Sequence, residues 1–151
     1  MSNFQRIGSI SNAHVGRDFE ATAMSVLKNA GFTVEQDFSV EVGVDQAKKS
    51  HCFDLGAESP AVLVECKSHK WTSGGNVPSA KMTVWNEAMY YFAVAPAHYK
   101  KILFVLHDTR AKSGETLAEY YFRRHRHLVP QNVEIWEYDP KKHTVRIHGV
   151  G

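Results

Sequence analysis

The sequence predicts an α/β fold in which a mixed central β-sheet is flanked by helices. Segments with apolar residues at helical spacing alternate along the chain with short segments rich in β-branched and aromatic residues. Residues 61–67 begin as an unbroken apolar run, which is typical of a central strand buried on both faces. A helical pattern separates them from a second apolar run at 101–107, as a parallel crossover between two strands requires.

Length and composition favour one domain spanning residues 1–151. The 151 residues are 43% hydrophobic and 23% charged, which is close to the averages of globular proteins. No apolar run approaches the roughly 18 residues of a membrane span, and residues 1–11 lack the apolar core of a signal peptide. We therefore expect a cytoplasmic protein with no membrane partner. The formal charge of +2 is compatible with nucleic-acid binding but does not require it.

The first predicted elements are a helix and an interrupted strand. Residues 1–12 are polar and lack periodicity, so we expect a loose lead-in segment there. Apolar residues recur at helical spacing over 13–30, and Gly31 is a typical helix end. Alternating β-branched and aromatic residues at 32–34 and 38–44 then predict one long or interrupted strand.

The next two strands are predicted at 51–55 and 61–67. Gly56 and Pro60 mark a turn between them, so the two strands would form a hairpin. The following loop, 68–79, contains small residues that allow a close approach to a ligand.

The second half of the chain is predicted to alternate between helices and strands. The elements are a helix over 80–95, a strand over 101–107, a helix over 115–127 and a terminal hairpin with strands at 133–138 and 144–148. Thr116 and Glu119 have the spacing of a capping box at the start of the second of these helices.

Two carboxylates and one ammonium group gather around the 61–67 strand. Because side chains alternate along a strand, Glu65 and Lys67 share one face and Cys66 faces the other way. The predicted hairpin would bring Asp54 beside Glu65. Neighbouring carboxylates raise each other's pKa unless a cation neutralises them, and oxygen ligands select a hard ion such as Mg²⁺. Solvated side chains at strand ends would explain the same residues equally well.

Asp54 and the run Glu65-Cys66-Lys67 resemble the signature of the PD-(D/E)xK, or restriction-endonuclease-like, nuclease superfamily. The resemblance covers residues 15–106. The common core of that family is a helix, a three-stranded antiparallel sheet, a second helix and a fourth strand. Its first acidic residue ends the second core strand, and its Glu-x-Lys signature lies on the third. Many members add a glutamate from the first helix, which Glu20 resembles.

The resemblance implies a Mg²⁺-dependent DNA endonuclease, in which Mn²⁺ would substitute for Mg²⁺. It implies Asp54 and Glu65 as metal ligands, with the backbone carbonyl of Cys66 and the carboxylate of Glu20 as further ligands. Lys67 would orient the attacking water or stabilise charge. Cutting both strands of a duplex would need a homodimer. Two alternatives stay open: a catalytically inactive nucleic-acid-binding or assembly protein on the same fold, and a metal-dependent enzyme for a small phosphoester.

Candidate DNA contacts outside the acidic centre are mostly basic side chains. The loop that follows Lys67 combines positive charge with an aromatic ring, which suits contact with phosphates and bases. Ordinary loop chemistry and a solvated helix end are the competing explanations. The candidates are His14, His69, Lys70, Trp71, Lys81, Arg123, Arg124 and Arg126.

A zinc site is a further alternative, because two histidines and two cysteines lie near the candidate site. They are His51, Cys52, Cys66 and His69. Cys66 is predicted on the face opposite Glu65, among apolar residues, which favours a buried thiol.

Overall fold

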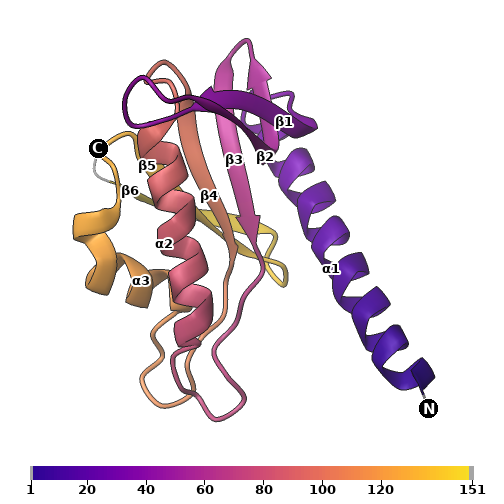
Figure 1. Ribbon diagram of the computed structural model, residues 1–151. Coiled ribbons are helices and arrows are strands. Elements are labelled where there is room, and N and C mark those ends of the chain that lie inside the picture. The colour runs from indigo at the N-terminus through magenta and orange to yellow at the C-terminus, as the bar shows by residue number, and fades with distance from the viewer. Residues whose placement is uncertain (1, 150–151) are drawn as a thin grey trace.

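A six-stranded mixed sheet forms the centre of the molecule, with helices on both faces (Figure 1). The computed structural model describes the backbone of residues 2–149 and the side chains of residues 16–149. In chain order the elements are α1 (Ser2–Asn29), β1 (Glu35–Val42), β2 (Lys49–Glu58), β3 (Ala61–Lys67), α2 (Ser79–Val94), β4 (Lys100–Leu106), α3 (Leu117–His125), a 3-10 turn η1 (Arg126–Leu128), β5 (Val133–Asp139) and β6 (Thr144–Gly149).

The strands lie in the sheet in their order along the chain, from β1 to β6. Helix α1 packs its buried side chains on one face of the sheet, and α2 and α3 pack theirs on the other. The predicted mixed α/β class and the predicted order of elements are confirmed. Within the described part of the chain, no helix combines the length and the apolar character needed to cross a membrane.

Helix α1 is longer than its sequence pattern indicates. The expectation of a loose segment over residues 1–12 was wrong for residues 2–12, which are helical. These residues contain no proline and one glycine, Gly8, so no strong helix breaker interrupts the backbone. In the second half of the helix, Phe19 and Leu27 are buried against the sheet.

The first three strands form an antiparallel unit in which the pairing is incomplete. β1 pairs with β2 along almost its whole length. β2 pairs with β3 only over its last four residues, beginning at Leu55↔Val64. β2 itself extends beyond the predicted 51–55 at both ends. Asp54 consequently lies inside the strand rather than at its end. Asp54 nevertheless marks the point where β2 separates from β3.

Along the β1–β2 hairpin, the buried side chains switch from one face of the sheet to the other at Asp37 and Asp54. These two residues lie opposite each other in the pairing of the strands. Leu55 packs on the α1 face of the sheet, whereas Phe53 packs on the α2 face. Regular alternation would place both on one face, so the hairpin is strongly twisted at this point. Asp37 has a φ of 54°, a conformation that aspartate adopts more readily than most residues do.

The outer part of this hairpin, residues 38–53, lies against α2, and we call it the hairpin arm. At its turn, the Gly43 N–H donates a hydrogen bond to the Val94 carbonyl at 3.1 Å, at the end of α2. Closer to the sheet, the His51 ring stacks on the Tyr91 ring with 3.7 Å between centroids. Figure 1 shows the arm crossing towards the end of α2.

Helix α2 provides the crossover between β3 and β4, which are parallel as predicted. The predicted apolar stripe of the helix is buried, and it consists of Met82, Trp85, Met89 and Phe92. Pro96 follows shortly after the end of the helix, and it prevents the helix from continuing because proline lacks a backbone N–H.

The C-terminal elements extend the sheet. The predicted capping box of α3 is present: the Thr116 hydroxyl accepts a hydrogen bond from the Glu119 N–H at 3.0 Å, and the Glu119 carboxylate accepts one from the Thr116 N–H at 2.8 Å. β5 runs parallel to β4, and β6 runs antiparallel to β5, which confirms the terminal hairpin.

One buried carboxylate ties these last elements together. Glu137 of β5 is only 2% exposed. One of its oxygens accepts hydrogen bonds from His148 of β6 at 2.8 Å and from Thr116 at 3.2 Å, and the other contacts Nδ1 of His107. Burial alone would raise the pKa of Glu137, but the hydrogen bonds from the two histidines hold it below its ordinary value.

Replacing Glu137 with alanine should lower the free energy of unfolding by roughly 3 kcal/mol, because two histidines and a hydroxyl lose a buried partner. Chemical denaturation measures the change. Glu134→Ala, on the same strand, removes a half-exposed ion pair with Lys100 and one hydrogen bond from the Trp136 indole, and should cost roughly 1 kcal/mol. Equal losses in the two variants would show that Glu137 does not hold these elements together.

Candidate functional site

The candidate site begins where β2 and β3 separate. Cys66 lies beyond the last residue pair between the two strands. Its backbone N–H donates instead to Oδ2 of Asp54 at 2.8 Å. The carboxylate thus replaces the missing strand partner of a partly buried backbone donor. Because the N–H and C=O of one strand residue point to the same side, the carbonyl oxygen of Cys66 also faces Asp54.

Glu65 is the buried carboxylate of the site, with 7% of the residue exposed. It faces α2, on the same side as Lys67, as the alternation along the strand predicts. The Lys67 ammonium group lies 3.8 Å from one carboxylate oxygen, and Nε2 of His51 lies 3.8 Å from the other. Both distances are longer than a hydrogen bond, so neither neighbour fully satisfies the buried charge.

The pKa of Glu65 is raised from its ordinary value of 4.5 to about 8. Burial is the largest cause, and the negative charge of Asp54 is the next. Lys67 acts in the opposite direction but does not compensate for these two effects. In the absence of a cation, the Glu65 carboxyl therefore holds a proton at neutral pH.

A third carboxylate reaches the site from α1. Burial raises the pKa of Glu20, and the charges of Asp54 and Asp37 raise it further, while Arg17 and Lys67 act in the opposite direction. Glu20 comes from the α1 side of the sheet, and Glu65 lies on the α2 side. The structure brings Asp54, Glu65 and Lys67 together, whereas Glu20 interacts with Asp54 and Lys67 through its charge from the opposite face of the sheet.

The donor set has the chemistry of a site for a hard divalent cation. Among the described side chains, no three His, Cys, Asp or Glu residues converge into a ready-made metal site. The carboxylates of Asp54 and Glu65 and the carbonyl of Cys66 are nevertheless oxygen donors on one side of the strand split, and burial disfavours the charged form of Glu65. Mg²⁺ prefers such donors and would remove the repulsion between the two carboxylates. The residues present fit this ion.

The four residues of the zinc alternative do not form one cluster. Cys66 packs on the α1 face with the apolar side chains of β3, and burial raises the pKa of its thiol. Nδ1 of His69 accepts a hydrogen bond from the Trp85 indole at 2.9 Å. Both cysteines are free thiols, and Cys52 is exposed.

Two residues without a site role predicted from the sequence, Glu87 and Tyr91, line the hollow beside Glu65 and Lys67. This hollow, of about 170 Å³, is also lined by His51, Cys52, Val84 and Ala88. The residues from α2 have helical spacing and form a second stripe beside the buried one. The sequence shows this helical spacing, but it does not show that the hairpin arm lies against the stripe. Glu87 and Tyr91 are the polar and aromatic side chains that were missed, whereas His51, predicted only for the zinc alternative, stacks on Tyr91 in this hollow.

His69 is held as a neutral hydrogen-bond donor close to the site. Burial lowers its pKa to about 4, and the charges of Lys81 and Lys67 contribute to the shift. Because Nδ1 accepts from Trp85, Nε2 carries the proton of the neutral ring. A phosphate contact by His69 would therefore be made by an uncharged N–H group.

Trp71 holds the loop after β3 against the rest of the molecule. It is 8% exposed, its backbone N–H donates to the Asp108 carboxylate at 2.9 Å, and its indole N–H donates to the Asp108 carbonyl at 3.0 Å. The guanidinium group of Arg110 lies 4.6 Å from its ring centroid. The ring that was predicted to contact bases is thus covered, and Trp71 acts as an anchor for the loop.

The remaining candidate DNA contacts are scattered. Lys70 and Lys81 are exposed on the loop after β3 and on the first turn of α2. Arg124 and Arg126 are exposed at the end of α3, whereas Arg123 is bonded to Glu115 through two hydrogen bonds of 2.9 and 3.1 Å. The side chain of His14 lies outside the described residues. These contacts stay predictions.

The fold and the acidic centre define a class of protein in structural terms: a mixed α/β protein with a buried carboxylate, a partly buried one and a lysine where two strands separate. No family model, curated protein or solved structure matches this chain. The resemblance to the nuclease superfamily rests on the residues and on the order of the elements.

In metal-free buffer, the stability of the protein should fall as the pH rises from about 4.5 to about 8 because of Glu65. Over this range the folded state keeps the proton that the unfolded chain has released. The loss is about 1.4 kcal/mol in the free energy of unfolding for each pH unit in which only the folded state is protonated. Denaturant unfolding at a series of pH values measures it.

Glu65→Gln is the matched variant for this measurement, because it keeps the shape of the side chain and removes the titration. Its stability should depend less on pH than that of the wild type. Added Mg²⁺ should stabilise the wild type most at the upper end of the range and should affect the variant little. Identical pH dependence in the two proteins would contradict the assignment.

Proposed function

We propose that the protein is a metal-dependent DNA nuclease of the PD-(D/E)xK type, acting in the cytoplasm as an endonuclease. The observation that carries the proposal is the meeting of Asp54, Glu65 and Lys67 where β2 leaves β3. The order α1, β1, β2, β3, α2, β4, with β3 parallel to β4, is the order of the common core that the resemblance implies, and it supports the proposal.

The side chains of the site have distinct roles in this proposal. Asp54 and Glu65, with the carbonyl of Cys66 and the carboxylate of Glu20, would hold Mg²⁺ or Mn²⁺. The bound ion would polarise the phosphate and lower the pKa of a water molecule.

Lys67 would act on the phosphate itself. Its ammonium group, 3.8 Å from Glu65, would stabilise the charge that develops on the phosphate oxygens as water attacks phosphorus and the bond to the leaving sugar oxygen breaks. One such site cuts one strand, so a double-strand cut would need a homodimer.

Purified protein should nick supercoiled plasmid in the presence of Mg²⁺ or Mn²⁺ and should be inactive in excess chelator. Asp54→Asn, Glu65→Gln and Lys67→Ala should each lower the rate about 100-fold or more, because each removes a charge from the reaction centre. Asp54→Asn is informative because its amide oxygen can still accept the Cys66 N–H, which preserves the fold. Gel electrophoresis of the plasmid forms measures the rate.

Lys28→Ala is the control, since this exposed lysine lies in the last turn of α1. It should nick at the wild-type rate. Nicking that survives both Asp54→Asn and Lys67→Ala would refute the proposal. Calorimetric titration with Mn²⁺ tests the catalytically inactive alternative. A protein that has lost the metal site should show no heat of Mn²⁺ binding, whereas a functional site should show a heat of binding that Glu65→Gln abolishes.

A further inference from the structure

A groove runs from the candidate site along α2, beneath the hairpin arm. It consists of three neighbouring hollows of about 170, 570 and 510 Å³, which share lining residues where the hairpin arm contacts α2. The first contains Glu65 and Lys67, and it shares with the second the lining residues His51, Cys52, Glu87 and Tyr91. The second shares with the third the lining residues Gly43, Val44 and Val94.

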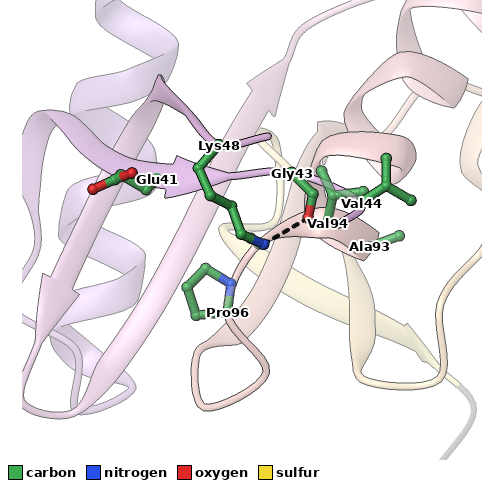
Figure 2. A pocket seen from close by; sticks show the side chains of 8 residues that line it. Glu41, Gly43, Val44, Lys48, Ala93, Val94 and Pro96 are labelled. Carbon is green, nitrogen blue, oxygen red and sulfur yellow. Dashed lines mark hydrogen bonds between the residues drawn. The ribbon is translucent and has the colours of Figure 1, made fainter. Parts of the chain in front are cut away.

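Figure 2 shows the far end of the groove, between the turn of the hairpin arm and the last turn of α2. Val44 and Lys48 come from the turn, and Val94 comes from the helix. The ammonium group of Lys48 donates to the Gly43 carbonyl at 3.0 Å, which ties the turn together. The groove is therefore bounded by two fixed elements, and it leads towards the acidic centre.

Exposed apolar side chains gather in this groove. The large hydrophobic side chains that are exposed in the described part of the chain are Val44, Tyr90, Leu128 and Ile147. Two of them, Val44 at 78% and Tyr90 at 60% exposure, line the middle hollow. Apolar surface that is left exposed in a concave site typically marks a binding surface, and the volume of the middle hollow is in the range of ligand pockets.

The lining of the middle hollow offers stacking and hydrogen-bonding groups rather than an excess of positive charge. Lys49 and Glu87 give it one charge of each sign. Phosphates of a duplex and of a single strand both need positive charge, so charge does not distinguish them, but a duplex keeps the faces of its bases stacked inside the helix. Unpaired bases bind by stacking on aromatic rings such as Tyr90, and a carboxylate such as that of Glu87 can accept a hydrogen bond from a base amino group.

We propose that this groove binds unpaired nucleotides of the strand that is cut at Asp54, Glu65 and Lys67. The preferred substrate class is then DNA with a single-stranded segment at the cleavage point, such as a fork or an overhang, over a continuous duplex. In a continuous duplex the bases are stacked inside the helix and cannot reach the Tyr90 ring without leaving the stack. This inference rests on the proposed nuclease function.

The first test measures binding in excess chelator, where no hydrolysis occurs. The probes are a forked DNA with 2-aminopurine in its unpaired arm and a blunt duplex that carries the same label. The wild type should bind the fork more tightly and change the fluorescence of the unpaired label. Tyr90→Ala should weaken fork binding about 10-fold or more and leave duplex binding unchanged, whereas Tyr90→Phe should behave as the wild type does.

Ile147→Ala is the matched control, because it removes an exposed apolar side chain from β6, at the other edge of the sheet. It should leave both affinities unchanged. Equal affinity for the fork and the blunt duplex would overturn the inference. The same conclusion would follow if Tyr90→Ala had no effect, or if it had an effect equal to that of Ile147→Ala.

The second test measures hydrolysis of the same DNA molecules with Mg²⁺. Tyr90→Ala should slow cleavage of the fork by the factor found in binding and should slow cleavage of the blunt duplex much less. If Lys67→Ala abolishes cleavage but Tyr90→Ala changes nothing, the groove inference fails and the nuclease proposal stands. If the wild type cleaves neither DNA but binds the fork through Tyr90, the nuclease proposal fails, and the groove remains a surface that binds single strands.

Discussion

The hydrogen bond between Asp54 and the backbone N–H of Cys66 is the interaction on which the candidate site depends. β2 must leave β3 at this point so that the hairpin arm can lie against α2, and a strand that loses its neighbour leaves backbone groups without partners. A carboxylate takes the place of the lost partner. The same substitution puts a negative charge beside Glu65, so the break in the sheet and the acidic centre have one structural cause.

Two buried carboxylates in this protein show how local partners decide between a structural and a chemical role. Glu137 has hydrogen-bond donors at both oxygens, and its pKa is lowered although it is buried. Glu65 has Lys67 and His51 only at 3.8 Å, and its pKa is raised to about 8. The first arrangement stabilises the fold. The second disfavours the charged form of the carboxyl, and a bound cation would stabilise that form.

Helix α2 serves both the core and the site. One stripe, which includes Trp85, is buried between the sheet and α3. The adjacent stripe, which includes Glu87 and Tyr91, faces the hairpin arm and lines the groove. Because the arm is twisted at Asp37 and lies against this second stripe, a surface that would otherwise face solvent becomes concave beside the acidic centre.

The sequence by itself determined the class of fold, the order of the elements, the bounds of β3 and the shared face of Glu65 and Lys67. These follow from periodicities that repeat every two or four residues and so are written locally in the chain. Only the tertiary structure decided where β2 leaves β3, that Asp54 bonds to Cys66, and that the Trp71 ring is covered. Those outcomes depend on strand twist and on contacts between residues distant in the chain, which no local pattern contains.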